Sequence, residues 1–187
     1  MIVSSGHIER VVARYLAVFP EEQDRLRPLL SSQAERAESF ASRKDEVGHV
    51  TCGVALIRRG GHVLTIRHRA LERWLLPGGH LDANDISLED AALRELMEEC
   101  GVTPRGLIAL GPAPGVPFDI DVHCIPACEA RDEAEHFHYD FRFAFGLDME
   151  SAVRLQLDEV EDFAWVTFDE LGDKNLGSKL RSTARAA

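Results

Sequence analysis

A tight glycine turn, followed at helical distance by a run of carboxylates, constrains this chain more than any other feature. The turn is Leu76-Pro77-Gly78-Gly79, and the run lies in Arg94-Glu95-Leu96-Met97-Glu98-Glu99-Cys100-Gly101-Val102. On a helix, Glu95, Glu98 and Glu99 fall at i, i+3 and i+4 and share one face. Their like charges repel, so this spacing alone leaves two interpretations open: a solvated charged face, or carboxylates that hold a hard divalent cation.

The sequence around these carboxylates predicts a helix over residues 88–100. Ser87 is a suitable N-cap, and Gly101 is a natural C-terminal stop. The apolar stripe predicted to be buried consists of Leu88, Ala91, Ala92, Leu93 and Leu96. The carboxylates are then expected to point away from the core. Because two glycines let the backbone approach a ligand closely, the turn and the helix together favour a site for a divalent cation and a diphosphate.

These residues resemble the Nudix box, G-x5-E-x7-R-E-U-x-E-E-x-G-U, in which U is an aliphatic residue. Residues 94–102 fill every defined position of its second half, and Gly79 supplies the opening glycine. In the first half, counting forward from Gly79 reaches Asp85, whereas counting back from Arg94 reaches Ile86. We therefore predict a loop one residue longer than usual, with Asp85 in place of the box glutamate that helps to hold the arginine in this family.

The resemblance to the Nudix hydrolases implies a fold, a cofactor and a reaction. The expected fold class is α/β: a Nudix-type α/β/α sandwich with a mixed sheet, plus an N-terminal helical extension. Glu98 and Glu99 would bind Mg2+, or Mn2+ as a substitute, and the backbone carbonyl of Gly79 would complete the coordination. Glu95 would be a metal ligand or the base, and Arg94 would orient the carboxylates. The implied reaction is hydrolysis of a diphosphate bond in a nucleoside diphosphate linked to another moiety, by metal-activated water.

Two other functions remain open on the same fold. A non-catalytic nucleotide-binding sensor would result if the altered Asp85 loop had spoiled the metal geometry. An isomerase of isoprenoid diphosphates would keep the metal and the diphosphate without hydrolysis. The substrate is open among oxidised nucleoside triphosphates, nucleotide sugars, ADP-ribose and dinucleotide polyphosphates, because recognition of base and sugar would lie on loops and on the N-terminal helices.

The chain divides by its pattern into three parts. Residues 1–46 are predicted to form the helical extension, because apolar residues recur at helical spacing before Pro20 and residues 31–44 have the pattern of a polar helix. Residues 47–172 are expected to form the Nudix domain, and residues 173–187 a basic, flexible tail. The extension could pack on the domain, cover the site or serve a dimer interface, so a homodimer is one open arrangement.

The strand predicted over residues 136–145 has two different faces. Five aromatic residues on one face are expected to be buried, whereas His136, His138 and Asp140 lie on the other. These three are candidates for binding substrate phosphates or sugar, and equally for the wet side of an antiparallel sheet. A third interpretation is a zinc site made of Cys124, Cys128, His136 and His138. The spacing of those four residues matches no usual ligand pattern.

Two further candidates lie elsewhere in the expected domain. Strands at residues 50–57 and 62–66 are predicted to form a hairpin, and the segment 58–73 holds five arginines against one acid. Arg67 in this segment is a candidate for phosphate contact, or a solvated arginine beside the hairpin. Glu159 precedes a strand with tryptophan, as an acidic residue does in many Nudix domains. It is a candidate auxiliary metal ligand or base, or part of an acidic loop with no catalytic duty.

Charge and composition exclude some partners. The net charge of −11 argues against a general nucleic-acid binder, whereas a small phosphorylated substrate remains compatible with it. No apolar run approaches the roughly 20 residues that span a bilayer, and the amino terminus lacks the pattern of a secretory signal. We therefore expect a cytoplasmic protein with reduced cysteines and no membrane partner. The 187 residues, 45% of them hydrophobic, suffice for one core without a partner.

Overall fold

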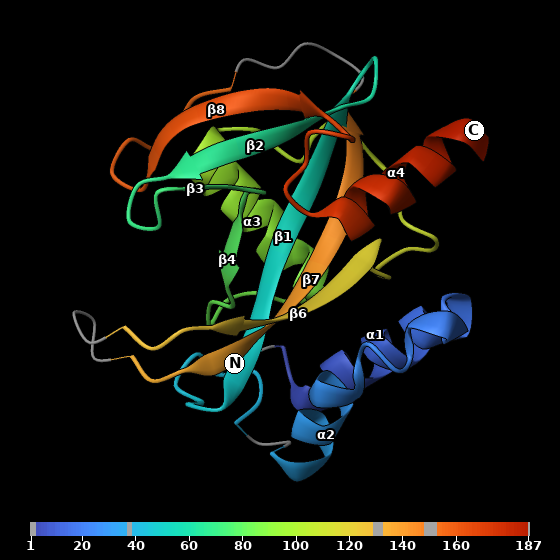
Figure 1. The fold of residues 1–187 in the computed structure, drawn as a ribbon, viewed down its shortest axis with the longest axis vertical. Helices are drawn as coiled ribbons and strands as arrows, with labels where there is room; N and C mark the ends of the chain where they lie inside the picture. The colour runs from blue at the N-terminus through green and yellow to red at the C-terminus, as the bar shows by residue number, and fades with distance from the viewer. Residues whose placement is uncertain (1–2, 37–38, 129–132, 148–152, 187) are drawn as a thin grey trace.

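A computed structural model describes residues 3–36, 39–128, 133–147 and 153–186 (Figure 1). The elements follow one another in this order: α1 (Ser5–Val18), the 3-10 helix η1 (Pro20–Glu22), α2 (Arg27–Glu35), β1 (Gly48–Arg58), β2 (His62–His68), β3 (Arg73–Leu75), β4 (Gly78–His80), α3 (Leu88–Cys100), β5 (Leu107–Ala109), β6 (Asp119–Ile125), β7 (His136–Leu147), β8 (Val160–Thr167) and α4 (Lys174–Ala186).

A mixed, eight-stranded sheet forms the centre of the molecule. Its main order is β3-β2-β1-β7-β5, and β4, β6 and β8 pair with β1, β7 and β2. β1 and β7 run parallel, from Gly48 opposite Phe137 to Arg58 opposite Leu147. The predicted hairpin is confirmed, because β1 pairs antiparallel with β2. β6 also pairs antiparallel with β7. The predicted α/β class with a mixed sheet is therefore confirmed as well.

Helices cover both faces of this sheet, which gives the expected three layers. Successive side chains of a strand point to opposite faces. On β1, Val54 and Leu56 belong to the hydrophobic cluster that includes α3, whereas Ala55 belongs to the cluster that includes Leu176 and Leu180 of α4. Figure 1 shows α3 behind β1 and α4 in front of it.

Two predictions about the ends of the chain are wrong. Residues 173–187 were expected to be a flexible tail, but α4 is helical through Ala186, because Leu176 and Leu180 are buried against the sheet. The helix expected over residues 31–44, which falls partly outside the described residues, instead ends at Glu35. Beyond it the chain turns back as Arg36 forms an ion pair with the buried Asp45.

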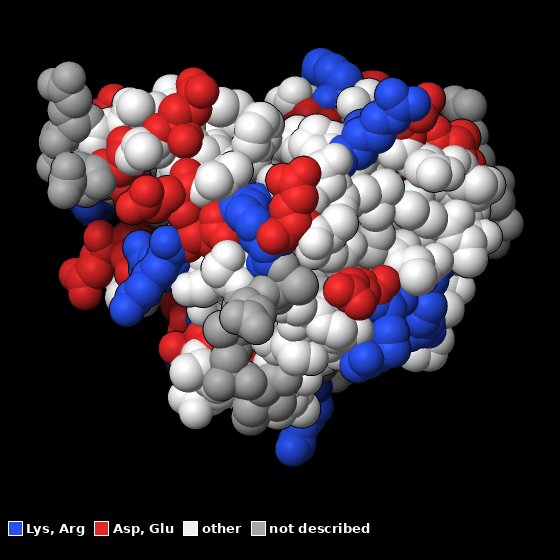
Figure 2. Space-filling view, turned by 90° about the horizontal axis from the view of Figure 1, so that it is seen from below, with Lys and Arg blue, Asp and Glu red and all other residues white. Residues whose placement is uncertain are grey.

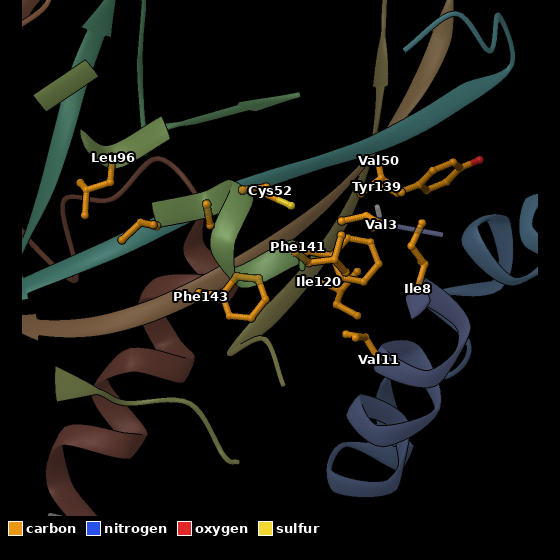
Figure 3. Packing of buried hydrophobic residues seen from close by; sticks show 14 of the residues in the cluster. Val3, Ile8, Val11, Val50, Cys52, Leu96, Ile120, Tyr139, Phe141 and Phe143 are labelled. Atoms are coloured by element: carbon orange, nitrogen blue, oxygen red, sulfur yellow. The ribbon is translucent and has the colours of Figure 1, made fainter. Parts of the chain in front are cut away.

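The helical extension packs on the edge of the core. The apolar stripe of α1 is buried, as its spacing predicts. In Figure 3, Ile8 and Val11 lie close to Ile120 of β6 and Phe141 of β7. The hydroxyl of Ser32 on α2 lies 2.5 Å from the hydroxyl of the buried Tyr139. Plain packing on the sheet is thus observed for both N-terminal helices.

A buried arginine on β7 gathers four carboxylates. Arg142 donates to Asp140 at 2.8 Å, Asp121 at 3.1 Å, Asp173 at 2.5 Å and Asp119 at 3.4 Å. Its side chain is 11% exposed. Because Asp173 immediately precedes α4, this cluster ties the start of that helix to the sheet.

Lys179 extends the same network to the N-terminal helices. Its Nζ donates to the hydroxyl of Tyr15 at 2.7 Å and to Glu22 at 2.7 Å, and it lies 3.4 Å from Asp119. The Tyr15 hydroxyl is also the acceptor for the backbone N–H of Ile120, at 3.3 Å. Helices from the two ends of the chain are therefore joined through charges that lie over β6.

None of the described helices combines the length and the apolarity that a bilayer-spanning helix requires. On the face seen in Figure 2, the described Lys and Arg side chains are separated by acidic and uncharged residues and form no continuous basic stripe.

We expect Arg142→Met to destabilise the protein by about 3–5 kcal/mol, because it leaves buried carboxylates without their cation. Urea denaturation would measure the change in the free energy of unfolding. Arg27→Met is the control, since Arg27 pairs with Asp24 while both side chains are at least 75% exposed, and it should shift that free energy by less than about 0.5 kcal/mol. Equal effects of the two substitutions would contradict a stabilising role for the buried network.

Candidate active site

The helix that carries the carboxylates begins and ends where the sequence predicts. The hydroxyl of Ser87 accepts the backbone N–H of Asp90 at 3.0 Å, and Gly101 ends α3 in the left-handed conformation, with φ of 65°. One expectation about this helix is wrong. The carboxylates were predicted to point away from the core, but Glu99 is only 3% exposed. It is buried because it meets the glycine strand that packs across α3.

That strand, β4, brings backbone atoms directly against the carboxylates. It pairs antiparallel with β1, with Gly79 opposite Cys52. The N–H of Gly78 donates to Glu99 Oε2 at 2.8 Å. A Cβ atom on Gly79 would lie 2.6 Å from Glu95 Oε1, so no other residue fits there without moving this carboxylate. The glycines therefore let the turn face the carboxylates, as predicted.

Arg94 uses all five of its N–H donors within this site. Nε and Nη2 bind the two oxygens of Asp85, at 2.9 and 3.1 Å. Nη2 also donates to the backbone carbonyl of His80, at 2.9 Å. Nη1 binds Glu95 Oε1 and Glu98 Oε2, each at 2.9 Å. One guanidinium thus fixes the loop, the glycine strand and two carboxylates of α3.

The structure confirms that Asp85 takes the place of the box glutamate. Its side chain is buried, and both of its oxygens accept hydrogen bonds from Arg94. Its Oδ2 also accepts the backbone N–H of Asp82 at 2.6 Å. Ile86, which the backward count would place there, is 63% exposed. The longer loop therefore keeps the support of the arginine.

The site carries an excess of negative charge. The pKa of Glu99 is raised to about 8, mainly by burial and further by the neighbouring charges of Glu95, Glu159 and Glu98, against the opposing effect of the Gly78 N–H. Burial also raises the pKa of Glu95, and Glu98 and Glu159 add to the shift. Glu159, exposed just before β8, thus lies near enough to Glu95 and Glu99 for its charge to raise their pKa values. An all-oxygen set of donors with this charge suits a hard divalent cation such as Mg2+.

Two predicted substrate-binding residues already have partners within the protein. Arg67 donates to Glu161 of β8 at 2.9 Å, on an exposed part of the sheet. Asp140 accepts from Thr51 at 3.0 Å and from Arg142 at 2.8 Å. Contact of Arg67 or Asp140 with a substrate stays a prediction.

The other two, His136 and His138, lie in a cluster of imidazoles that the sequence did not reveal. The parallel register sets His49 of β1 opposite His138 of β7, and His80 follows the glycines of β4. Nε2 of His80 lies 3.1 Å from Nε2 of His49, and Nε2 of His136 lies 3.3 Å from that of His138. The only local signal was a histidine directly after the glycine turn.

The zinc ligands weighed from the sequence are not the ones that converge. Among the described residues, the group with metal-ligand spacing consists of His49, His80 and His138, and neither Cys124 nor Cys128 belongs to it. All four cysteines of the chain are free thiols. The aromatic face of β7 is buried as predicted, except that Phe137 at its start is 36% exposed.

We expect Asp85→Asn to destabilise the protein by about 1–3 kcal/mol, because it weakens charge-assisted hydrogen bonds to Arg94 in a buried place. Ile86→Glu is the control, since an exposed residue should change the free energy of unfolding by less than about 0.5 kcal/mol. The double variant should be no more stable than Asp85→Asn alone. If thermal or urea denaturation showed that Ile86→Glu restores the stability lost in Asp85→Asn, position 86 rather than 85 would be the box position.

The raised pKa of Glu99 predicts how stability depends on pH in the metal-free protein. A carboxylate whose folded pKa of about 8 exceeds its ordinary value of 4.5 stabilises the fold below that ordinary value, and the contribution is lost as pH rises through 8. Unfolding in EDTA, followed from about pH 5 to about pH 9, should show wild type losing stability relative to Glu99→Gln. Parallel curves for the two proteins would contradict the assignment.

Several known proteins are similar to this chain in sequence or in fold. The chain is 30% identical over 103 residues to a probable DHNTP pyrophosphohydrolase of Lactococcus lactis subsp. cremoris (strain MG1363), an alignment that spans 55% of this chain and 57% of that protein. A solved Ap4A hydrolase of C. elegans shares the fold at a TM-score of 0.56 and 19% identity, covering 73% of this chain and 96% of that one. The E. coli dihydroneopterin triphosphate pyrophosphohydrolase gives a TM-score of 0.55 at 14% identity, covering 74% and 96%.

The family match extends further than the sequence led us to expect. It begins at residue 47, as predicted, but runs to residue 186 and so includes α4. Because this match covers most of the chain and contains the whole arrangement around Arg94, the protein belongs to the NUDIX domain family.

Proposed function

We propose that the protein hydrolyses a diphosphate bond in a nucleoside diphosphate linked to another moiety, with Mg2+ as its cofactor. The observation that carries this proposal is the arrangement around Arg94, whose five hydrogen bonds hold Glu95 and Glu98 beside the glycine strand. A site already organised before the reaction costs no reorganisation during it. The altered first half of the box does not disturb it, because Asp85 supplies the missing support.

The donor atoms present fit the metal that the family implies. Glu98 and Glu99 would hold it, together with the backbone carbonyl of Gly79, and Mn2+ would be a substitute. When bound, such a cation neutralises charge on phosphate oxygens and lowers the pKa of water. Binding requires Glu99 to be ionised, so the cation must displace the proton that burial favours.

Glu95 is our candidate for the general base or a further ligand. Burial raises its pKa, which makes its carboxylate a better proton acceptor than an exposed one. Arg94 binds Oε1, so we assign Oε2 to take the proton of the attacking water. Arg94 is a positioning residue in this scheme. Glu159 would be an auxiliary ligand or base, since its charge contributes to the raised pKa values of Glu95 and Glu99.

Four side chains are candidates for contact with the substrate, and none is assigned to a particular atom of it. The ring of His138 lies 5.4 Å from that of His80 on the glycine strand, and His136 lies next to His138. Both histidines are candidates for contacts with phosphate or sugar, as is Asp140 on the same strand, β7. Arg67 would have to exchange Glu161 for a phosphate oxygen. The names of the relatives add dihydroneopterin triphosphate and Ap4A to the compounds worth testing.

The experiment that tests the proposal is a phosphate-release screen over nucleoside diphosphate derivatives with Mg2+. Phosphatase is added to expose monoester products. Glu98→Gln should reduce the rate by about 100-fold or more, because it removes a charged ligand of the metal. Glu89→Gln is the matched control: nine residues away at about 100° per residue, Glu89 lies on the opposite side of α3 and should leave the rate unchanged.

Three results would contradict the proposal. Ligand binding in a thermal-shift assay, with no release from any compound, would favour a nucleotide sensor. Conversion of an isoprenoid diphosphate without any release of phosphate would favour an isomerase. Equal rates in Glu98→Gln and wild type would remove the assigned metal site from the mechanism.

A further inference from the structure

Three strands that are distant in sequence bring a separate set of ring nitrogens together beside the carboxylate site. His49 lies on β1, His80 on β4 and His138 on β7, and one ring nitrogen of each lies within 4.8 Å of the others. β1 pairs with both other strands, which sets His49 opposite His138 and places Thr51, two residues along, opposite His80. Backbone pairing within the sheet therefore positions the three rings.

The spacing of one pair of these nitrogens suits a tetrahedral metal ion. Two nitrogens bound to zinc at about 2.0–2.1 Å lie about 3.3 Å apart in a tetrahedral arrangement. Nε2 of His49 and Nε2 of His80 are 3.1 Å apart. Two neutral rings satisfy such a contact only if one Nε2 carries a proton and the other accepts it. A cation between them would use a lone pair from each.

The second nitrogen of His49 is already oriented as in many metal sites. Its Nδ1 lies 3.3 Å from the backbone carbonyl of Asp45, to which it can only donate, so the lone pair is on Nε2. Nδ1 of His136 likewise donates to the carbonyl of Ala134 at 2.7 Å, and its Nε2 lies 3.3 Å from Nε2 of His138. His136 thus stands next to the three as a neighbour with its own lone pair.

The chemistry of the rings selects the kind of cation. Imidazole nitrogen suits Zn2+ and related transition metals, whereas carboxylate and carbonyl oxygens suit Mg2+. Burial lowers the pKa values of both His49 and His138, which favours the neutral form that binds metals over the charged form that binds anions.

We propose that His49, His80 and His138 form a binding site for a transition-metal dication of the Zn2+ type, separate from the carboxylate site. Three protein ligands leave a fourth position for water, for a ligand oxygen or for His136. The bound ion would tie β4 to β1 and β7 and stabilise the fold by mass action. This site does not depend on the proposed hydrolysis.

Titration of Zn2+ into the metal-free protein by calorimetry, in excess Mg2+, tests the proposal. Wild type should bind one Zn2+ per chain. Because loss of an outer-shell partner alone costs about 10–100-fold in metal affinity, His80→Asn and His138→Asn should each weaken binding by at least about 100-fold. His123→Asn is the control: its Nδ1 is held by Asp121 at 2.8 Å and it lies outside the group. Glu98→Gln should also bind Zn2+ as wild type does.

Thermal unfolding provides a second measurement on the same proteins. Zn2+ should raise the unfolding temperature of wild type and His123→Asn but not that of His138→Asn, whose unfolding without metal shows whether it folds. Absence of Zn2+ binding in wild type would overturn the proposal. Equal affinity in wild type and both histidine variants, or loss of binding in Glu98→Gln instead, would overturn it too.

Discussion

The guanidinium of Arg94 is the interaction on which the candidate active site depends. Three carboxylates at helical spacing repel one another, and two of them are also removed from water. Arg94 offsets part of this cost, because it binds Glu95 and Glu98 while its other edge is held by Asp85. The planar guanidinium fixes the directions of its hydrogen bonds as well as supplying a positive charge, whereas a lysine would supply the charge alone. The carboxylates are therefore organised by the protein itself.

Local signals in the sequence predicted the parts of the site that lie close together along the chain. The ends of α3 followed from Ser87 and Gly101, and the role of Asp85 followed from counting residues after Gly79. The burial of Glu99 did not follow, because β4 decides it by packing across the helix. The imidazole cluster was also out of reach, since a parallel register between β1 and β7 joins strands almost 90 residues apart.

The C-terminal helix was not predicted because contacts with remote segments, rather than a local pattern, determine its position. Few apolar residues recur in its short, basic sequence, so the pattern resembled that of a frayed end. Its place is set by partners that are remote in sequence: Lys179 binds Tyr15 and Glu22, and Asp173 binds Arg142. The charged residues of one segment therefore do not predict by themselves whether that segment packs on the domain. They hold it in place only when other elements supply residues of opposite charge at positions shielded from water.

The three residues of β4 link two sets of metal-binding atoms of different chemistry. Gly78 binds Glu99 through its N–H, and Gly79 lies against Glu95. His80 gives its carbonyl to Arg94 and its ring to the imidazole cluster. A shift of β4 would therefore disturb the hydrogen bonds of the carboxylate site and the spacing of the rings together. An ion held by the rings would restrain this strand, and with it the position of Glu99, without touching any oxygen ligand of the first site.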